Sequence, residues 1–206
     1  MHALPVLSLI LFVLWMLLVE AVRGLVQRRR TGDWGFRRDI GGPGSIRWWA
    51  GVLPGLGALA AGAAAPVASL AGLEPFAGLA LPAVQAAGVA VAVAGILATF
   101  GAQLAMGDSW RIGLDETERT GLVTGGPFRF VRNPIYASMA VVALGLALMV
   151  PNLFSAVGVA ALIAGIQLQV RLVEEPHMRR THGAEYAHYE EAVGRFLPGV
   201  GRLPRR

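Results

Sequence analysis

Long apolar stretches are the feature of this sequence that most limits how the chain can fold. Five of them, separated by charged clusters, cover residues 4–19, 48–70, 79–106, 135–150 and 153–173. About 20 apolar residues in a helix cross the roughly 30 Å hydrocarbon core of a bilayer. The last two stretches have only Pro151-Asn152 between them, which predicts a helical hairpin. We therefore expect an all-α, polytopic membrane helical bundle of about five transmembrane helices, with a cytoplasmic C-terminal amphipathic helix.

Composition supports this class and excludes several others. Of the 206 residues, 55% are hydrophobic and 15% are charged, whereas soluble domains carry about 25% charged residues. The chain has no Cys and no Lys, which excludes disulfides, thiolate metal sites and a Schiff-base lysine. The first stretch lacks a basic leader and a clear cleavage site, so we interpret it as an uncleaved span rather than a signal peptide.

We predict a single integral membrane domain over residues 1–206. Residues 1–106 contain the first three spans. Residues 107–206 form the candidate catalytic region, with the helical hairpin at 135–173 and a cytoplasmic tail.

The arginines predict the orientation of the bundle. All 18 basic residues are Arg: seven lie between the first two spans, four between the third and fourth, and seven at or beyond the end of the fifth. The positive-inside rule then places the N-terminus outside and the C-terminus, with any active site, in the cytoplasm. This distribution explains the isoelectric point near 10.9 without a nucleic-acid partner. All-Arg usage is typical of a GC-rich genome and favours a bacterial inner membrane.

The segment GLVTGGPFRFVRNPIYAS, residues 121–138, is the first candidate for chemistry. Gly125-Gly126-Pro127 indicates a tight turn, and Asn133-Pro134 is a typical N-cap and first helical residue. Arg132, Asn133 and Tyr136 fall within one turn of a helix N-terminus, which favours a carboxylate or another polar ligand group. A capped helix start with an interfacial aromatic belt is the alternative interpretation.

A second candidate lies at the end of the fifth span. Helical spacing places four side chains on one face: Gln167, Arg171, Glu174 and Glu175. They are functional candidates because ionisable groups are costly at the end of a span. A structural ion pair between Arg171 and one of the glutamates is the alternative.

Further along, the spacing predicts an amphipathic helix whose apolar positions are Tyr186, Tyr189, Val193 and Phe196. The three histidines of the tail, His177, His182 and His188, lack the spacing of a helical zinc site, so we expect no metal. The acidic run Asp115, Glu116 and Glu118 is most simply a solvated surface.

The residues GGPFRFVRNPIY, Glu174-Glu175 and GAEYAHYEEAVGRFLP, together with GDSW at 107–110, resemble the isoprenylcysteine carboxyl methyltransferase family and its broader phospholipid-methyltransferase-like relatives. The resemblance extends over about half of the chain, from Gly107 to Pro198. It implies a helical membrane methyltransferase that uses S-adenosylmethionine without a Rossmann domain. The chain departs from the family pattern at Asn133, where the family has His, and at Pro176 and His177 after the glutamates.

The resemblance also implies roles for individual residues. The cofactor-binding set would be Val123, Gly126, Arg132, Asn133, Pro134, Tyr136, Glu174 and Glu175. The catalytic candidates are Arg171, Glu175 and Arg195, and the substrate-binding candidates are Trp110, Arg171 and Ser138. A lipophilic substrate would enter between the fourth and fifth spans, where Ala137, Ser138 and Gly145 leave room.

The expected activity is methyl transfer to a small lipophilic acceptor, above all a carboxylate, as in a prenylcysteine-like O-methyltransferase. Phospholipid amine N-methylation and thiol S-methylation are alternatives within the same chemistry. From other classes, an NADPH-dependent membrane reductase shares a similar C-terminal pattern, and a non-catalytic lipid-binding protein also fits. The expected partners are the acceptor and membrane lipids, and the residues predict no oligomeric state.

Overall fold

Helices are the regular secondary structure of the described residues. The computed structural model describes residues 2–35, 41–110 and 121–203. Over these ranges it contains helices and no strand, and its extended contacts are two isolated bridges, Val131 with Gly194 and Leu197 with Val200. The predicted all-α class is confirmed.

Within the described ranges, four helices are long and apolar enough to cross a membrane, namely Ala3–Thr31, Ile46–Leu70, Pro82–Ala105 and Leu153–Ala192. A shorter apolar helix, α6 (Pro134–Met149), has 16 residues, which corresponds to about 24 Å at 1.5 Å per residue. Each of these five helices overlaps one of the five predicted apolar stretches, and the first and the last continue well beyond it. The expected polytopic bundle is therefore confirmed.

Three of the long helices contain a π-helical segment. The segments divide them into α1 (Ala3–Met16), η1 (Leu17–Val22) and α2 (Arg23–Thr31); α3 (Ile46–Leu59), η2 (Ala60–Ala64) and α4 (Ala65–Leu70); and α7 (Leu153–Leu168), η5 (Gln169–Glu174) and α8 (Glu175–Ala192). The remaining elements are α5 (Pro82–Ala105) and the short 3₁₀ turns η3 (Gly107–Ser109) and η4 (Gly126–Arg129). A π turn shifts the faces of the helix on either side of it.

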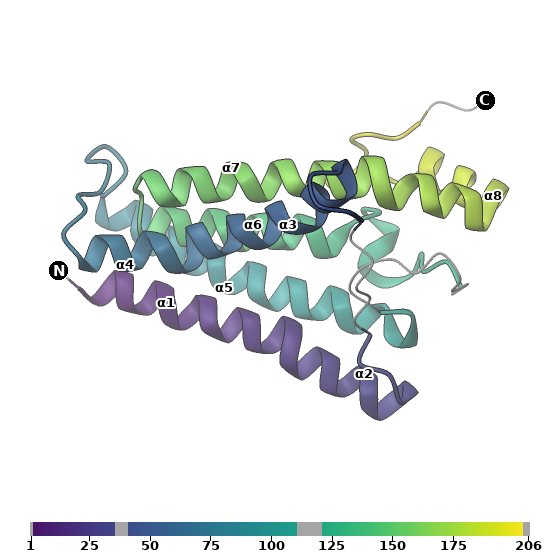
Figure 1. The fold of residues 1–206 in the computed structure, drawn as a ribbon, viewed down its shortest axis with the longest axis horizontal. Helices are drawn as coiled ribbons and strands as arrows, with labels where there is room; N and C mark the ends of the chain where they lie inside the picture. Colours follow the sequence, from purple (N-terminus) through teal and green to yellow (C-terminus); the bar gives the residue numbers. More distant parts are fainter. Residues whose placement is uncertain (1, 36–40, 111–120, 204–206) are drawn as a thin grey trace.

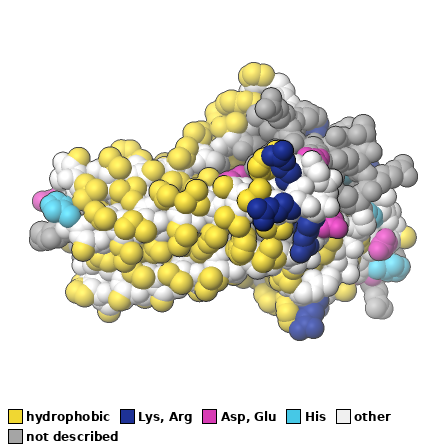
Figure 2. Space-filling model, turned by 90° about the horizontal axis from the view of Figure 1, so that it is seen from below, with side chains coloured by type: hydrophobic (Ala, Val, Ile, Leu, Met, Phe, Trp, Pro, Cys, Tyr) yellow, Lys and Arg dark blue, Asp and Glu magenta, His cyan; other side chains and the backbone are white. Residues whose placement is uncertain are grey.

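The two ends of the bundle differ in charge. Figure 1 shows the N-terminus, the connection after α4 and the start of α7 at one end, and α2, α8 and the C-terminus at the other. Figure 2 shows a largely hydrophobic flank whose dark blue Arg side chains gather toward one end. This separation agrees with the predicted charge distribution, while the side that faces the cytoplasm stays a prediction. The residues outside the described ranges include Arg37, Arg38, Arg111, Arg119, Arg205, Arg206 and the acidic run Asp115, Glu116 and Glu118.

Small residues set the closest helix contacts. A Cβ added to Gly145 of α6 would lie 2.3 Å from the backbone N of Ala92 in α5. On the other side of the bundle, a Cβ on Gly57 of α3 would lie 2.4 Å from the backbone N of Leu162 in α7. Membrane helices use such residues to approach closely. The predicted entry route at Gly145 is wrong in this respect, because α5 fills the space in front of that glycine.

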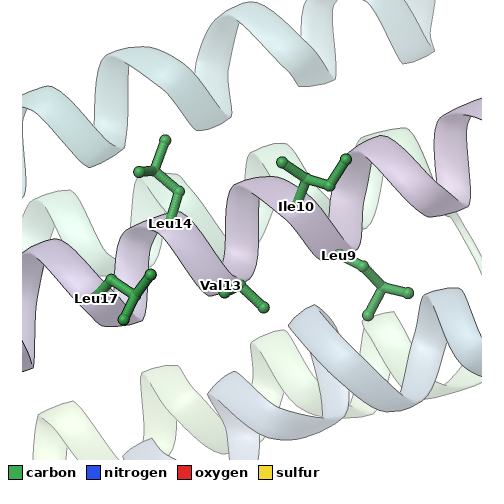
Figure 3. Close-up of a pocket in the computed structure, with 5 residues that line it drawn as sticks. All are labelled: Leu9, Ile10, Val13, Leu14 and Leu17. Atoms are coloured by element: carbon green, nitrogen blue, oxygen red, sulfur yellow. The ribbon is translucent and has the colours of Figure 1, made fainter.

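Apolar side chains from all five long or apolar helices form the core, and others face outward. Leu11 and Trp15 of α1, Leu146 of α6 and Leu162 of α7 belong to one buried cluster. Figure 3 shows a hollow lined by side chains of α1 and of the first residue of η1, which are Leu9, Ile10, Val13, Leu14 and Leu17. Four of these five are exposed, and all are aliphatic. Such a surface suits lipid tails and offers no polar group for chemistry.

The turn between α6 and α7 closes the predicted hairpin. Asn152 caps α7 in a capping box with Ser155, and its side-chain amide donates to the carbonyl of Ala65 at 2.8 Å. The backbone N–H of Phe76 donates to the carbonyl of Pro151 at 2.7 Å, which ties this turn to the connection after α4. The turn predicted at Pro151-Asn152 is therefore confirmed.

The C-terminal helix differs from the prediction. It continues the fifth span without a gap, because η5 leads directly into α8. Pro176 lies in the first turn of α8, where a helix tolerates proline. Gly183 interrupts α8 at φ 51° and ψ −121°, a conformation that side chains with a Cβ rarely adopt. The helix ends at Ala192, so Val193 and Phe196 do not extend its apolar face as predicted.

Candidate functional site

The hairpin brings the two candidate segments together at the arginine-rich end of the bundle. Arg132 lies two residues before the start of α6, and Glu175 is the first residue of α8. An Nη of Arg132 lies 2.9 Å from Oε1 of Glu175, and both side chains are at most 2% exposed. The expectation that both segments contribute to one cluster therefore agrees with the geometry.

Arg132 fastens this end of α6 to the C-terminal segment. One Nη donates to the carbonyls of Glu190 at 3.1 Å and Val193 at 2.6 Å. The other Nη donates to Glu175 and, at 3.3 Å, to the carbonyl of Gly201. The Nε is buried and has no hydrogen-bond partner in the described part of the chain. The guanidinium therefore has one free donor, and its other contacts are structural.

Glu175 is surrounded by arginines. Arg195 donates to its two carboxylate oxygens at 2.6 and 2.9 Å. Arg179 approaches Oε2 at 3.4 Å and also pairs with the buried Glu190 at 2.7 Å. The hydrogen bond to Glu175 raises the pKa of Arg195, so Arg195 stays charged at any ordinary pH. With both oxygens engaged, Glu175 is positioned to hold the cluster together.

Backbone contacts place the C-terminal segment beside the start of α6. The N–H of Arg132 donates to the carbonyl of Gly194 at 2.8 Å, and the N–H of Asn133 donates to that of Arg195 at 3.1 Å. The Tyr189 hydroxyl reaches the carbonyl of Phe128 at 2.5 Å. Asn133 holds the N-cap position of α6, as predicted, but its side chain does not cap the helix. It donates instead to the Arg195 carbonyl at 3.2 Å.

Glu174 faces a different set of partners. Its Oε1 accepts hydrogen bonds from the Tyr136 hydroxyl of α6 and, at 3.1 Å, from the side-chain amide of Gln169. Its Oε2 accepts no hydrogen bond from the described residues. Adjacent helix residues point about 100° apart, which explains why Glu174 and Glu175 have separate environments. Of the two carboxylates, Glu174 has the capacity left to bind a ligand.

The other predicted residues lie in several places. Arg171 is exposed and donates to Gln167 at 2.7 Å, so the alternative of an ion pair with Glu174 or Glu175 is wrong. The Ser138 hydroxyl donates to carbonyls of its own helix at 2.8 Å. Trp110 packs against Arg23 of α2, with the guanidinium carbon 4.5 Å from the ring centre.

Val123 and Gly126 lie in the segment before α6. Val123 is half-buried, and Gly126 begins η4 at φ 58°. A Cβ on Gly126 would have Ala105 as its nearest neighbour, at 3.6 Å. Space is available for a side chain at this position, so glycine is required here because of its positive φ. The sequence analysis identified the turn but not this conformation.

Four residues of the cluster were missed. These are Gln169, Arg179, Tyr189 and Glu190. Arg179 lies four residues after Glu175, a helical spacing that could have identified it. Glu190 approaches Arg179 only because α8 is interrupted at Gly183, and no spacing rule predicts that interruption.

The donors and acceptors of this cluster suit a molecule such as S-adenosylmethionine. Glu174 retains acceptor capacity for hydroxyl or ammonium groups, and the buried Nε of Arg132 is a free donor. The first N–H groups of α6 have no acceptor within their own helix and favour negative charge. A cofactor with a ribose, an ammonium and a carboxylate would match each of these groups.

Comparison with known proteins gives two matches. The family model described as phospholipid methyltransferase matches residues 76–185, a range that contains α5, α6, α7 and both Glu174 and Glu175. Over 89 residues the chain is 32% identical to Protein-S-isoprenylcysteine O-methyltransferase A of Arabidopsis thaliana. That alignment covers 43% of this chain and 45% of the relative, so the chain matches less than half of the relative's length.

Proposed function

We propose, since the chain belongs to the phospholipid methyltransferase family, that it transfers a methyl group from S-adenosylmethionine to a small lipophilic acceptor. The reaction would take place at the arginine-rich end of the bundle. The observation that carries this proposal is the pairing of α6 with the α7–α8 helix through two neighbouring glutamates. Glu175 binds Arg132, and Glu174 binds Tyr136.

The two glutamates would have different roles. Glu174 would bind the hydroxyl or ammonium groups of S-adenosylmethionine, held in place by Tyr136 and Gln169. Glu175 would act as a positioning residue, since arginines already occupy its oxygens. When bound, the cofactor supplies a methyl group that its sulfonium has already activated, so the protein mainly aligns donor and acceptor.

The charge around Glu175 favours an anionic acceptor on that side of the site. Three arginines, Arg132, Arg179 and Arg195, surround Glu175 and Glu190 and leave one excess positive charge there, while Glu174 lies apart with Tyr136 and Gln169. A carboxylate is ionised at neutral pH and needs no general base, and an arginine can orient it. A lipid ammonium would be repelled and would first have to lose a proton. Glu175 is a poor base for that step, because its arginine partners stabilise its charged form.

The similarity to an isoprenylcysteine O-methyltransferase also supports a carboxylate acceptor, because that relative is named for methylation on oxygen. The family description supports methylation in general and is compatible with a phospholipid amine acceptor. An O-methyl ester of a lipophilic carboxylate is therefore our first candidate product, and an N-methylated phospholipid amine is the second. Reductase and non-catalytic functions receive no support from either match.

Labelling identifies the acceptor directly. The full chain, purified in detergent, is incubated with methyl-labelled S-adenosylmethionine and a total lipid extract, and the labelled lipids are identified by mass spectrometry. We expect label that mild base releases, as from a methyl ester. Base-stable label on a headgroup amine would replace the first candidate with the second. No transferred label, combined with binding of NADPH, would refute the methyltransferase proposal.

A further inference from the structure

A second buried polar cluster lies where α2 packs against the end of α5 and against η3. It consists of Arg23, Gln27 and Gln103, and none of the three is more than 4% exposed. Figure 1 shows α2 at the same end of the bundle as α8. None of the three residues belongs to the cluster around Glu175.

The contacts of this cluster tie α2 to its neighbours. Arg23 donates through Nε to the carbonyl of Gln103 at 3.3 Å and through one Nη to that of Gly107 at 2.5 Å. The Gln27 amide donates to the carbonyl of Asp108 at 2.9 Å, and the Gln103 amide donates to that of Val19 at 3.4 Å. Both glutamine nitrogens therefore face carbonyls, which can only accept. This fixes the orientation of the two amide groups.

Three polar atoms in the cluster have no hydrogen-bond partner among the residues that the structure describes. They are one Nη of Arg23 and the Oε1 atoms of Gln27 and Gln103, all of them buried. The side chain of Asp108 pairs with Arg30 at 3.8 Å, and no ion pair of Arg23 is formed within the described residues. A buried guanidinium without an anion is unfavourable. The arrangement therefore calls for a ligand that has an anionic oxygen and also hydrogen-bond donors.

The depth of Arg23 indicates where that ligand comes from. Twenty residues separate the start of the first apolar stretch at Leu4 from Arg23, counting both. At 1.5 Å per residue this is about 30 Å, the thickness of the hydrocarbon core. Arg23 thus lies at the level of the lipid headgroups at the arginine-rich end. Basic pockets between transmembrane helices on the cytoplasmic side commonly bind anionic headgroups.

We propose that Arg23, Gln27 and Gln103 form a binding site for a phospholipid headgroup that carries hydroxyl donors. The free Nη of Arg23 binds a phosphate oxygen, and the two amide oxygens accept from the headgroup hydroxyls. The three free atoms are closed to solvent, so a headgroup can reach them only after a side chain that covers them has moved. Trp110, whose ring lies over the guanidinium, is placed to do so. The site is independent of methyl transfer.

Lipid-dependent stabilisation tests this site in the full chain. The protein is purified in detergent, and its thermal unfolding midpoint is measured against increasing short-chain phosphatidylglycerol, phosphatidylmethanol or inorganic phosphate. The two lipids have the same net charge, but phosphatidylmethanol lacks headgroup hydroxyls. We expect phosphatidylglycerol to raise the midpoint most, phosphatidylmethanol less, and phosphate not at all. Equal effects of both lipids, or an equal effect of phosphate, would overturn the assignment.

Variants locate the effect. Arg23→Gln should weaken the apparent affinity for phosphatidylglycerol about tenfold or more, because it removes a charged donor to phosphate. Arg29→Gln changes an exposed arginine of the same helix and should leave the affinity within about twofold. Arg23→Lys keeps the charge with fewer donors, and its affinity should lie between those of the other two variants. This variant also tests the site if Arg23→Gln does not fold. Unchanged affinity in Arg23→Gln or in Arg23→Lys would refute the proposal.

Discussion

The guanidinium of Arg132 donates to the carboxylate of Glu175 at 2.9 Å, although the two residues are 43 positions apart in the sequence. Both side chains are buried, and each has further partners in the C-terminal segment or in α8. This contact joins the start of α6 to the start of α8. The remainder of the candidate site is arranged around it.

Replacing Glu175 should therefore lower stability more than a typical change of charge. Glu175→Gln leaves Arg132 and Arg195 without their carboxylate partner, and breaking a buried ion pair in this way costs about 3–5 kcal/mol. The free energy of unfolding in detergent measures the effect. Glu185→Gln, at an exposed position of α8, is the matched control and should stay within about 0.5 kcal/mol. Equal stability of the two variants would show that the network contributes little.

The contact between α5 and α6 should not tolerate a methyl group at Gly145. Gly145→Ala places a Cβ only 2.3 Å from the backbone N of Ala92, so we expect a loss of about 1–3 kcal/mol in unfolding free energy. Gly101→Ala is a matched control, since an added Cβ meets nothing within 4 Å there. That variant should be unchanged or more stable by up to about 1 kcal/mol. A neutral Gly145→Ala would mean that these helices pack less closely than described.

The hydroxyl of Tyr136 should matter for ligand binding more than for folding. Tyr136→Phe keeps the ring in α6 and removes the hydrogen bond that orients Glu174. We expect S-adenosylhomocysteine to bind about tenfold more weakly, with one charged hydrogen bond lost, while the thermal midpoint changes little. Calorimetric titration measures the affinity. If the midpoint fell sharply and the affinity of the folded protein did not, Tyr136 would be a structural residue only.

The sequence could predict the architecture because hydropathy and arginine placement are set by the membrane. The hairpin at Pro151-Asn152 and the separation of charges between the two ends follow from those constraints alone. The meeting of Arg132 with Glu175 followed from the hairpin, because two antiparallel helices bring their outer ends together. These features required no knowledge of side-chain geometry.

The different hydrogen-bond partners of Glu174 and Glu175 could not be predicted from the sequence in the same way. Regular helical spacing placed both on one face with Arg171, but the π-helical segment η5 changes the register just before them. Arg171 consequently bonds Gln167, while Glu174 turns to Tyr136. Glu190 joins the arginines through the interruption at Gly183, a backbone conformation that hydropathy does not report.

Titration of S-adenosylhomocysteine into the detergent-purified protein tests the central claim most directly. Glu174 retains acceptor capacity that Glu175 has already used, so Glu174→Gln should weaken binding about 10- to 100-fold. Glu185→Gln should bind like the unaltered chain. Undiminished binding by a folded Glu174→Gln, or no binding by the unaltered chain, would contradict the account.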